Sequence, residues 1–139
     1  MEVYLKCIDH KGKRNLLARL RMGVLPLRIE TGRYELCGGK RGLPLKYRVC
    51  RCCCLSKIED EIHFLLECPL YSDLRVILLD VCKSNIKDFS LFNGDVSALF
   101  SLILGNKNKI VVHAVATFIW RAYSSRFKRL KNILANCGN

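Results

Sequence analysis

The chain is short of prolines, aromatic residues and long apolar runs, and each shortage excludes a class of protein. Its 139 residues include 3 prolines, 1 tryptophan and 9% aromatic residues, a composition that is neither low-complexity nor collagen-like. The longest apolar stretch, 110–120, falls well short of the roughly 20 residues that span a bilayer. The N-terminus also lacks the apolar segment of a secretory signal peptide. We therefore expect no membrane partner and an intracellular location, in the nucleus or the cytoplasm.

Motifs that carry catalysis are missing as well. The chain has neither the Tyr-x-Asp-Asp nor the Phe-Ala-Asp-Asp motif, whose aspartates hold the catalytic metal ions of polymerases. No serine lies in a nucleophile elbow, and the glycines at 38, 39 and 42 do not lead into a phosphate-binding loop. His113 lies in an apolar stretch, which favours a buried core histidine over a catalytic base. We expect no enzymatic activity and no small-molecule substrate.

Acidic residues are the other scarce class. The chain has 24 Lys and Arg against 12 Asp and Glu, a net charge of +12. Residues 1–50 carry 12 basic and 4 acidic groups, residues 51–104 carry 5 and 8, and residues 105–139 carry 7 and none. Two basic regions therefore flank a mildly acidic centre. Such regions attract phosphate backbones and anionic membrane surfaces, although a solvated surface would have the same composition.

Helical periodicity predicts a mainly α fold in a single domain over 1–139. Apolar residues at helical spacing predict an N-terminal basic helix within 13–27 that ends near Gly23. The glycine-rich segment that follows is predicted to be mostly loop, with at most a short strand or turn. Further helices are predicted from Ser72, from a cap at Asp95 to Leu104, and over 109–134.

A further helix is predicted over 57–67. Ser56 and Glu59 have the spacing of a capping box. Glu59, Asp60 and Glu61 would then lie in the first turn, where acidic groups complement the helix dipole. Pro69 would follow the end of this helix.

Cysteine is abundant, with 9 residues in this short chain. Four of them crowd into five positions: Cys50, Cys52, Cys53 and Cys54. An odd number, crowded together, argues against a disulfide framework. Clustered thiols in a reducing compartment bind metal or stay free, and four neighbours cannot all face one core. A metal site is therefore the favoured interpretation.

Cys50 and Cys53 have the Cys-x2-Cys spacing that lets one tight turn direct two sulfurs at one ion. His63 and Cys68 follow about a helical turn apart. Together these residues predict one structural zinc ion in a closed tetrahedral shell with no position left for a reactive water. Cys52 or Cys54 could replace either member of the first pair, but Cys52 with Cys54 is a cramped Cys-x-Cys.

The string IETGRYEL, followed by RVCRCC and IEDEIHFLLECPLYSDLR, resembles the C-terminal region of non-LTR (LINE-type) retrotransposon polyproteins. The match is close over 29–75 and looser in the flanking helices. It implies a zinc-binding module, with Cys50, Cys53, His63 and Cys68 as ligands. We accordingly divide the chain into a zinc-binding module over 28–75 and, from its helical periodicity, a helical C-terminal region over 76–139. Cys52 and Cys54 depart from the family pattern. The resemblance also implies that the chain is the tail of a reverse-transcriptase polyprotein without its catalytic parts.

Nucleic acid, bound without sequence specificity, is the partner that charge and resemblance together predict. The basic residues expected to contact phosphate are Arg33, Lys40, Arg41, Lys46 and Arg48 before the cysteine cluster, and Arg126, Lys128 and Arg129 in the last helix. Trp120, Tyr123 and Phe127 have the spacing of core residues, or alternatively stack on single-stranded bases. A protein-interaction module and a non-functional remnant of a decayed element remain alternative interpretations, and the oligomeric state is not predicted.

Overall fold

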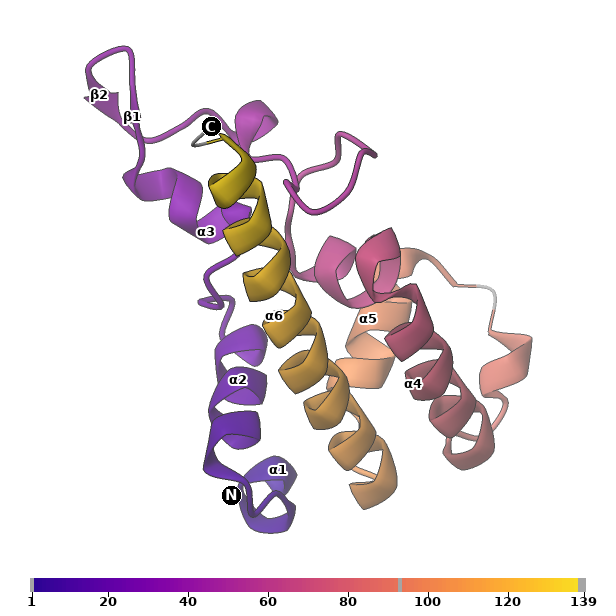
Figure 1. The fold of residues 1–139 in the computed structure, drawn as a ribbon. Helices are drawn as coiled ribbons and strands as arrows, with labels where there is room; N and C mark the ends of the chain where they lie inside the picture. The colour runs from indigo at the N-terminus through magenta and orange to yellow at the C-terminus, as the bar shows by residue number, and fades with distance from the viewer. Residues whose placement is uncertain (1, 93, 138–139) are drawn as a thin grey trace.

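The computed structural model describes residues 2–92 and 94–137 and confirms a mainly α fold (Figure 1). The α-helices are α1 (Val3–Cys7), α2 (Lys11–Arg21), α3 (Arg28–Thr31), α4 (Ser72–Asn85), α5 (Val96–Leu104) and α6 (Lys109–Cys137). Short helical turns are η1 (Gly32–Tyr34), η2 (Leu45–Tyr47), the π-helical η3 (His63–Glu67), η4 (Pro69–Tyr71) and η5 (Phe89–Leu91). One hairpin pairs β1 (Leu36–Cys37) with β2 (Lys40–Arg41) in antiparallel register.

Helix α6 runs through the middle of the molecule between α2 and α4 (Figure 1), and α1 and α5 also pack on it. Its inward face carries Val111, Val115, Phe118, Ile119 and Ala122, each at most 3% exposed. These residues recur at the three- and four-residue spacing of one helix face. Although α6 is long, no helix among the described residues combines the length and apolarity needed to cross a membrane.

Side-chain caps fix where three helices begin. His10 Nδ1 accepts the Lys13 N–H at 3.1 Å and starts α2. Asp95 Oδ1 accepts the Ala98 N–H at 2.7 Å, which confirms the predicted cap of α5. The Asn108 side chain accepts from the next helix, α6. Each cap satisfies an N–H that has no partner within its own helix. Helix α2 begins two residues before the predicted start.

The segment between α2 and the cysteine cluster contains more structure than predicted. Helix α3 forms at its start, and the hairpin tip turns through Gly38 and Gly39, whose φ angles are 59° and 80°. A two-residue hairpin loop requires positive φ at both positions, which glycine adopts without strain. The turn places Lys40 and Arg41 on an exposed strand.

The predicted helix over 57–67 is wrong in its first half. Residues 51–60 are irregular, and Val49 and Ile58 form an antiparallel bridge instead. Ser56 has a left-handed φ of 55° and does not cap a helix. Helical backbone begins only at Glu61, and Asp60 accepts the His63 N–H at 2.7 Å in place of the predicted cap.

The prediction that His113 is buried is also wrong, because its side chain is exposed. Position 113 lies about 200° around the helix from both Val111 and Val115, which face the core. The apolar stretch is thus wider than the buried face of the helix, and hydropathy alone could not show which residue points outward.

Candidate metal centre

A short backbone ladder shapes the cysteine cluster. The Cys50 N–H donates to the Lys57 carbonyl at 2.8 Å, and the Glu59 N–H donates to the Arg48 carbonyl at 3.0 Å. These bonds close the loop 51–56 into a narrow knuckle. Within it, the Cys52 N–H donates to Cys50 Sγ at 3.4 Å. The loop is therefore held by its own backbone, with the Cys50 sulfur turned inward.

The turn η3 brings the histidine and the last cysteine together. Residues five apart lie about 140° from one another around an ordinary α-helix. Here the Cys68 N–H donates to the His63 carbonyl at 2.7 Å, the wider bond of a π-helix. Cys68 then adopts extended backbone, with φ −62° and ψ 122°. The wider turn and the extended residue place both ligands on the same side.

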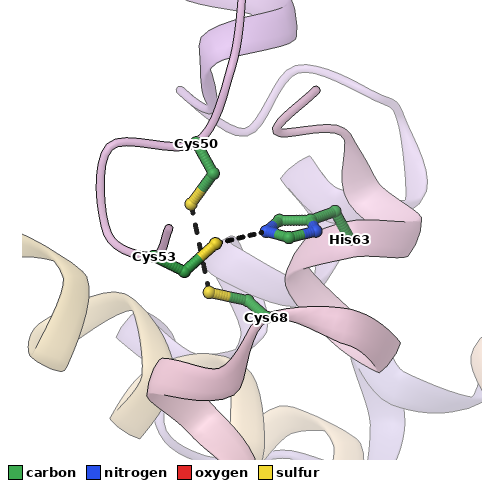
Figure 2. A group of neighbouring side chains, drawn as sticks. All are labelled: Cys50, Cys53, His63 and Cys68. Carbon is green, nitrogen blue, oxygen red and sulfur yellow. Dashed lines mark hydrogen bonds between the residues drawn. The ribbon is translucent and has the colours of Figure 1, made fainter. Parts of the chain in front are cut away.

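Figure 2 shows Cys50, Cys53, His63 and Cys68 pointing toward one another. One ligand atom from each lies within 4.8 Å of all the others, so this group can hold a metal ion. The Cys50 and Cys68 sulfurs are 3.9 Å apart, and Cys53 Sγ lies 3.5 Å from His63 Nε2. A tetrahedral zinc ion would separate two sulfurs by ~3.8 Å and a sulfur from a nitrogen by ~3.6 Å, given its usual bond lengths. The residues therefore fit such an ion.

The thiols of this group favour a cation electrostatically. Hydrogen bonds from Cys52 and Cys68 lower the pKa of the Cys50 thiol. Burial raises the pKa of Cys53. The hydrogen bond to Cys50, followed by burial, raises the pKa of Cys68. One thiolate thus hinders ionisation of its neighbours, and a divalent ion at the centre would remove this penalty.

The structure distinguishes between the alternative cysteine registers. Cys54 is exposed and lies outside the group of possible ligands, whereas Cys53 lies within it. Cys52 is buried beside Cys50 and Glu59. The hydrogen bond between the Cys52 and Cys50 thiols, with burial, raises the pKa of Cys52. Cys52 groups with Cys50 and Glu59, whereas Cys53 is the cysteine that groups with Cys50, His63 and Cys68.

The second ring nitrogen of His63 is buried and faces a carboxylate beyond hydrogen-bond distance. His63 is 1% exposed, and its Nδ1 has no hydrogen-bond partner among the described residues. The nearest carboxylate oxygen, Glu67 Oε1, lies 3.9 Å away on the same turn. With Nε2 directed at the sulfurs, Nδ1 would carry the proton and face this carboxylate, as metal-bound histidines commonly do.

A buried ion pair between Arg126 and Glu59 lies next to the metal group. Arg126 donates to both carboxylate oxygens of Glu59, at 2.9 and 2.7 Å, and Glu59 also accepts the Arg28 N–H at 2.8 Å. Glu59 Oε2 is 3.7 Å from Cys50 Sγ. Burial lowers the pKa of Arg126, but the bonds to Glu59 outweigh it and the net shift is upward. The pair ties α6 to the knuckle.

Arg126 therefore corrects two sequence predictions. Its guanidinium is buried and fully engaged by Glu59, so it is not free to contact phosphate. Glu59 is not a helix-dipole residue, because it is 1% exposed and lies before the helical turn begins. Nothing in the spacing of either residue indicates this contact across the chain.

Arg75 is a further residue that sequence reasoning missed. Its side chain is buried and donates to the carbonyls of Leu65 and Cys68, both at 2.9 Å. These carbonyls lie at the end of η3, and the Cys68 carbonyl also accepts the Tyr71 N–H at 3.2 Å. Arg75 thereby fixes the backbone of the last ligand. Its only sequence signal is its position at the end of the string that carries the resemblance.

The other predicted phosphate contacts divide into exposed and structural residues. Arg48 is half-buried and donates to the carbonyls of Leu43 and Ile29 at 2.8 and 3.0 Å, so its predicted role in binding is corrected to a structural one. The remaining predicted cations are exposed: Arg33, Lys40, Arg41, Lys46, Lys128 and Arg129.

An exposed cation beside the cysteine cluster, Arg51, was not among the predicted contacts. Arg51 lies inside the knuckle and, with Arg129 of α6, lines a surface hollow of about 440 Å³ beside the cysteine cluster. Its guanidinium lies 4.0 Å from Glu35, at the base of the hairpin. Cations from the knuckle and from α6 therefore line the same surface hollow.

The chain was compared with models of protein families, with curated proteins and with solved structures, and none of the three comparisons returned a match.

Proposed function

We propose that the chain is a zinc-binding, nucleic-acid-binding module that holds RNA or DNA through its phosphates and catalyses no reaction. The proposal rests on exposed cations in the segments before, within and after the cysteine cluster: Arg33, Lys40, Arg41, Lys46, Arg51, Lys128 and Arg129. Of these, Arg51 and Arg129 line the hollow beside the cluster. In this proposal the module is the tail of a LINE-type retrotransposon polyprotein, on the resemblance of residues 29–75.

Zinc is the ion that the donor set favours. Three thiolates and one imidazole are soft ligands in a tetrahedral arrangement, which zinc accepts without preference for another geometry. All coordination positions are filled by the protein, so the ion would stabilise the fold and would not activate water.

The metal group itself is not the attractive surface for phosphate. Three thiolates outweigh one divalent ion by a single negative charge, and Glu59 is already paired with Arg126. Attraction would come from the cations that the knuckle, the hairpin and α6 hold nearby. This arrangement supports binding to backbone charge and offers no base-specific contacts.

Binding across a salt series tests the proposal. Anisotropy of a labelled oligonucleotide, single-stranded or duplex, should show affinity falling steeply between about 50 and 200 mM salt. Replacing Lys40 and Arg41 with Gln should lower the slope of log K against log salt by about 1.4 to 1.8. The matched control replaces Lys83 and Lys87, which are exposed cations in α4 and just after it; its slope should not change.

Absent or salt-independent binding would contradict the proposal and favour a protein-interaction module. Equal slopes in the hairpin variant and in the control would contradict the assigned surface.

A further inference from the structure

A groove lies between α2 and α6, with a volume of about 550 Å³. This is within the ~300–1,000 Å³ of typical ligand sites. Its lining combines aromatic rings with basic groups: Trp120, Tyr123, Phe127 and Lys128 from α6, and Leu16 and Arg19 from α2.

Two of the rings are partly or largely exposed to solvent. Phe127 is 65% exposed and Trp120 is 37% exposed, although both belong to the helix that forms the core. Tyr123 lies between them in sequence and is partly buried against the core. A single exposed apolar residue is ordinary, but neighbouring exposed aromatics that line one hollow indicate an interaction surface.

The Trp120 ring is held in place before any ligand arrives. Its edge meets the His10 ring at a centroid distance of 4.7 Å and an interplanar angle of 65°. Beside His10 lies Gly12, where a Cβ would come within 2.5 Å of Trp120 Cζ3 and 3.0 Å of His10 Cε1. The glycine lets the ring lie directly against α2. A ring fixed in this way loses little conformational freedom on binding.

The positive charge of α2 and α6 favours a negatively charged ligand in the groove. Neither α2 nor α6 contains an acidic residue, while α2 carries 5 Lys and Arg and α6 carries 6. Arg126 is neutralised by Glu59, but Arg19 and Lys128 are exposed at the groove itself. An occupant that combines flat apolar surfaces with regular negative charge complements this lining.

We infer that the groove between α2 and α6 binds single-stranded nucleic acid, with bases stacking on Trp120 and Phe127 and phosphates contacting Arg19 and Lys128. Every base has a face that can stack, so such a site tolerates any sequence. Bases inside a duplex are already stacked and cannot present their faces. The inference rests on the proposed function and deepens it, because it names single strands as the preferred form.

The chain's single tryptophan makes the groove directly observable. Titration of the zinc-loaded chain with an unlabelled single-stranded oligonucleotide of about 12 nucleotides, within the usual site size, should quench Trp120 fluorescence in parallel with binding. An abasic oligonucleotide of the same length has the phosphates without the bases. It should bind more weakly and leave the emission unchanged.

Variants at Phe127 separate stacking from charge. Phe127→Leu should weaken single-strand binding about 5- to 150-fold, the usual effect of losing one stacked base. Its salt slope and its affinity for the abasic strand should not change. Phe127→Tyr should retain affinity, and so should Leu134→Ala, which removes an exposed apolar residue outside the groove on the same helix.

Three outcomes would overturn the inference in distinguishable ways. If the oligonucleotide binds but neither Trp120 emission nor the Phe127 variants respond, the proposed function stands and the groove is not the site. If no nucleic acid binds at any salt concentration, both fail. If an acidic amphipathic peptide shifts Trp120 emission and the oligonucleotide does not, the groove binds protein instead.

Discussion

Arg126→Met is the substitution that tests most sharply how the metal group is joined to the rest of the fold. It keeps most of the aliphatic stem and removes the guanidinium that donates to both Glu59 oxygens at 2.9 and 2.7 Å. The two side chains are 10% and 2% exposed, so water cannot replace the lost bonds. The Glu59 charge would remain buried 3.7 Å from the Cys50 sulfur.

Breaking a buried pair in this way costs about 3–5 kcal/mol, because the surviving charge has no partner. A domain of this size has about 5–15 kcal/mol of unfolding free energy, so a large share would be lost. The melting temperature should fall by roughly 10–20 °C. Adding Glu59→Gln to Arg126→Met should recover part of the loss, since no buried charge then remains.

Urea unfolding of the zinc-loaded chain measures this effect, with Arg129→Met as the matched control. Arg129 is exposed on the same helix, and its substitution should change the unfolding free energy by no more than about 0.5 kcal/mol. The reasoning is refuted if Arg126→Met and the control unfold at the same urea concentration, or if the double variant is less stable than Arg126→Met alone.

Three further predictions concern stability. Burial raises the pKa of Cys82 from 9.0 to about 11. The unfolding free energy should therefore be highest below pH 9 and fall by roughly 2–3 kcal/mol as pH rises to about 11. Cys82→Ala should flatten this decline, and a variant with the same pH profile as the parent chain would contradict the prediction. Asp60→Ala removes a cap and should cost about 0.5–2 kcal/mol in urea unfolding, whereas Ser56→Ala should cost little. A larger loss for Ser56→Ala than for Asp60→Ala would mean that Ser56 is the cap after all. Gly32→Ala would place a Cβ 2.6 Å from Arg48 Cγ and should cost about 1–3 kcal/mol, and a neutral effect in thermal unfolding would show that Arg48 is free to move.

The candidate metal ligands could be predicted because they are close to one another in sequence. Cys50 and Cys53 have the Cys-x2-Cys spacing of a single tight turn. His63 and Cys68 lie on the same side only because a π-helical turn replaces the predicted α-helix. The long last helix and the Asp95 cap were predictable for the same reason, since both depend on neighbours within a few residues.

The roles of charged residues could not be predicted in this way. Glu59 fits a capping box by spacing, but its partner is Arg126, 67 positions away. Arg48 and Arg75 look like solvent-exposed cations, yet each binds two backbone carbonyls that only the folded loops bring within reach. A charge count records such residues as surface charge, and only tertiary contacts show that they are structural.

Metal analysis of purified variants, each with one cysteine replaced by serine, shows whether Cys50, Cys53, His63 and Cys68 hold one zinc ion. The chain itself, Cys52→Ser and Cys54→Ser should each retain one zinc ion per chain, because neither substituted thiol is among the proposed ligands. Cys53→Ser and Cys68→Ser should lose the ion and much of the helical signal in circular dichroism. A folded chain that carries no metal, or a Cys54→Ser variant that loses zinc while Cys53→Ser retains it, would show that these four residues are not the ligands.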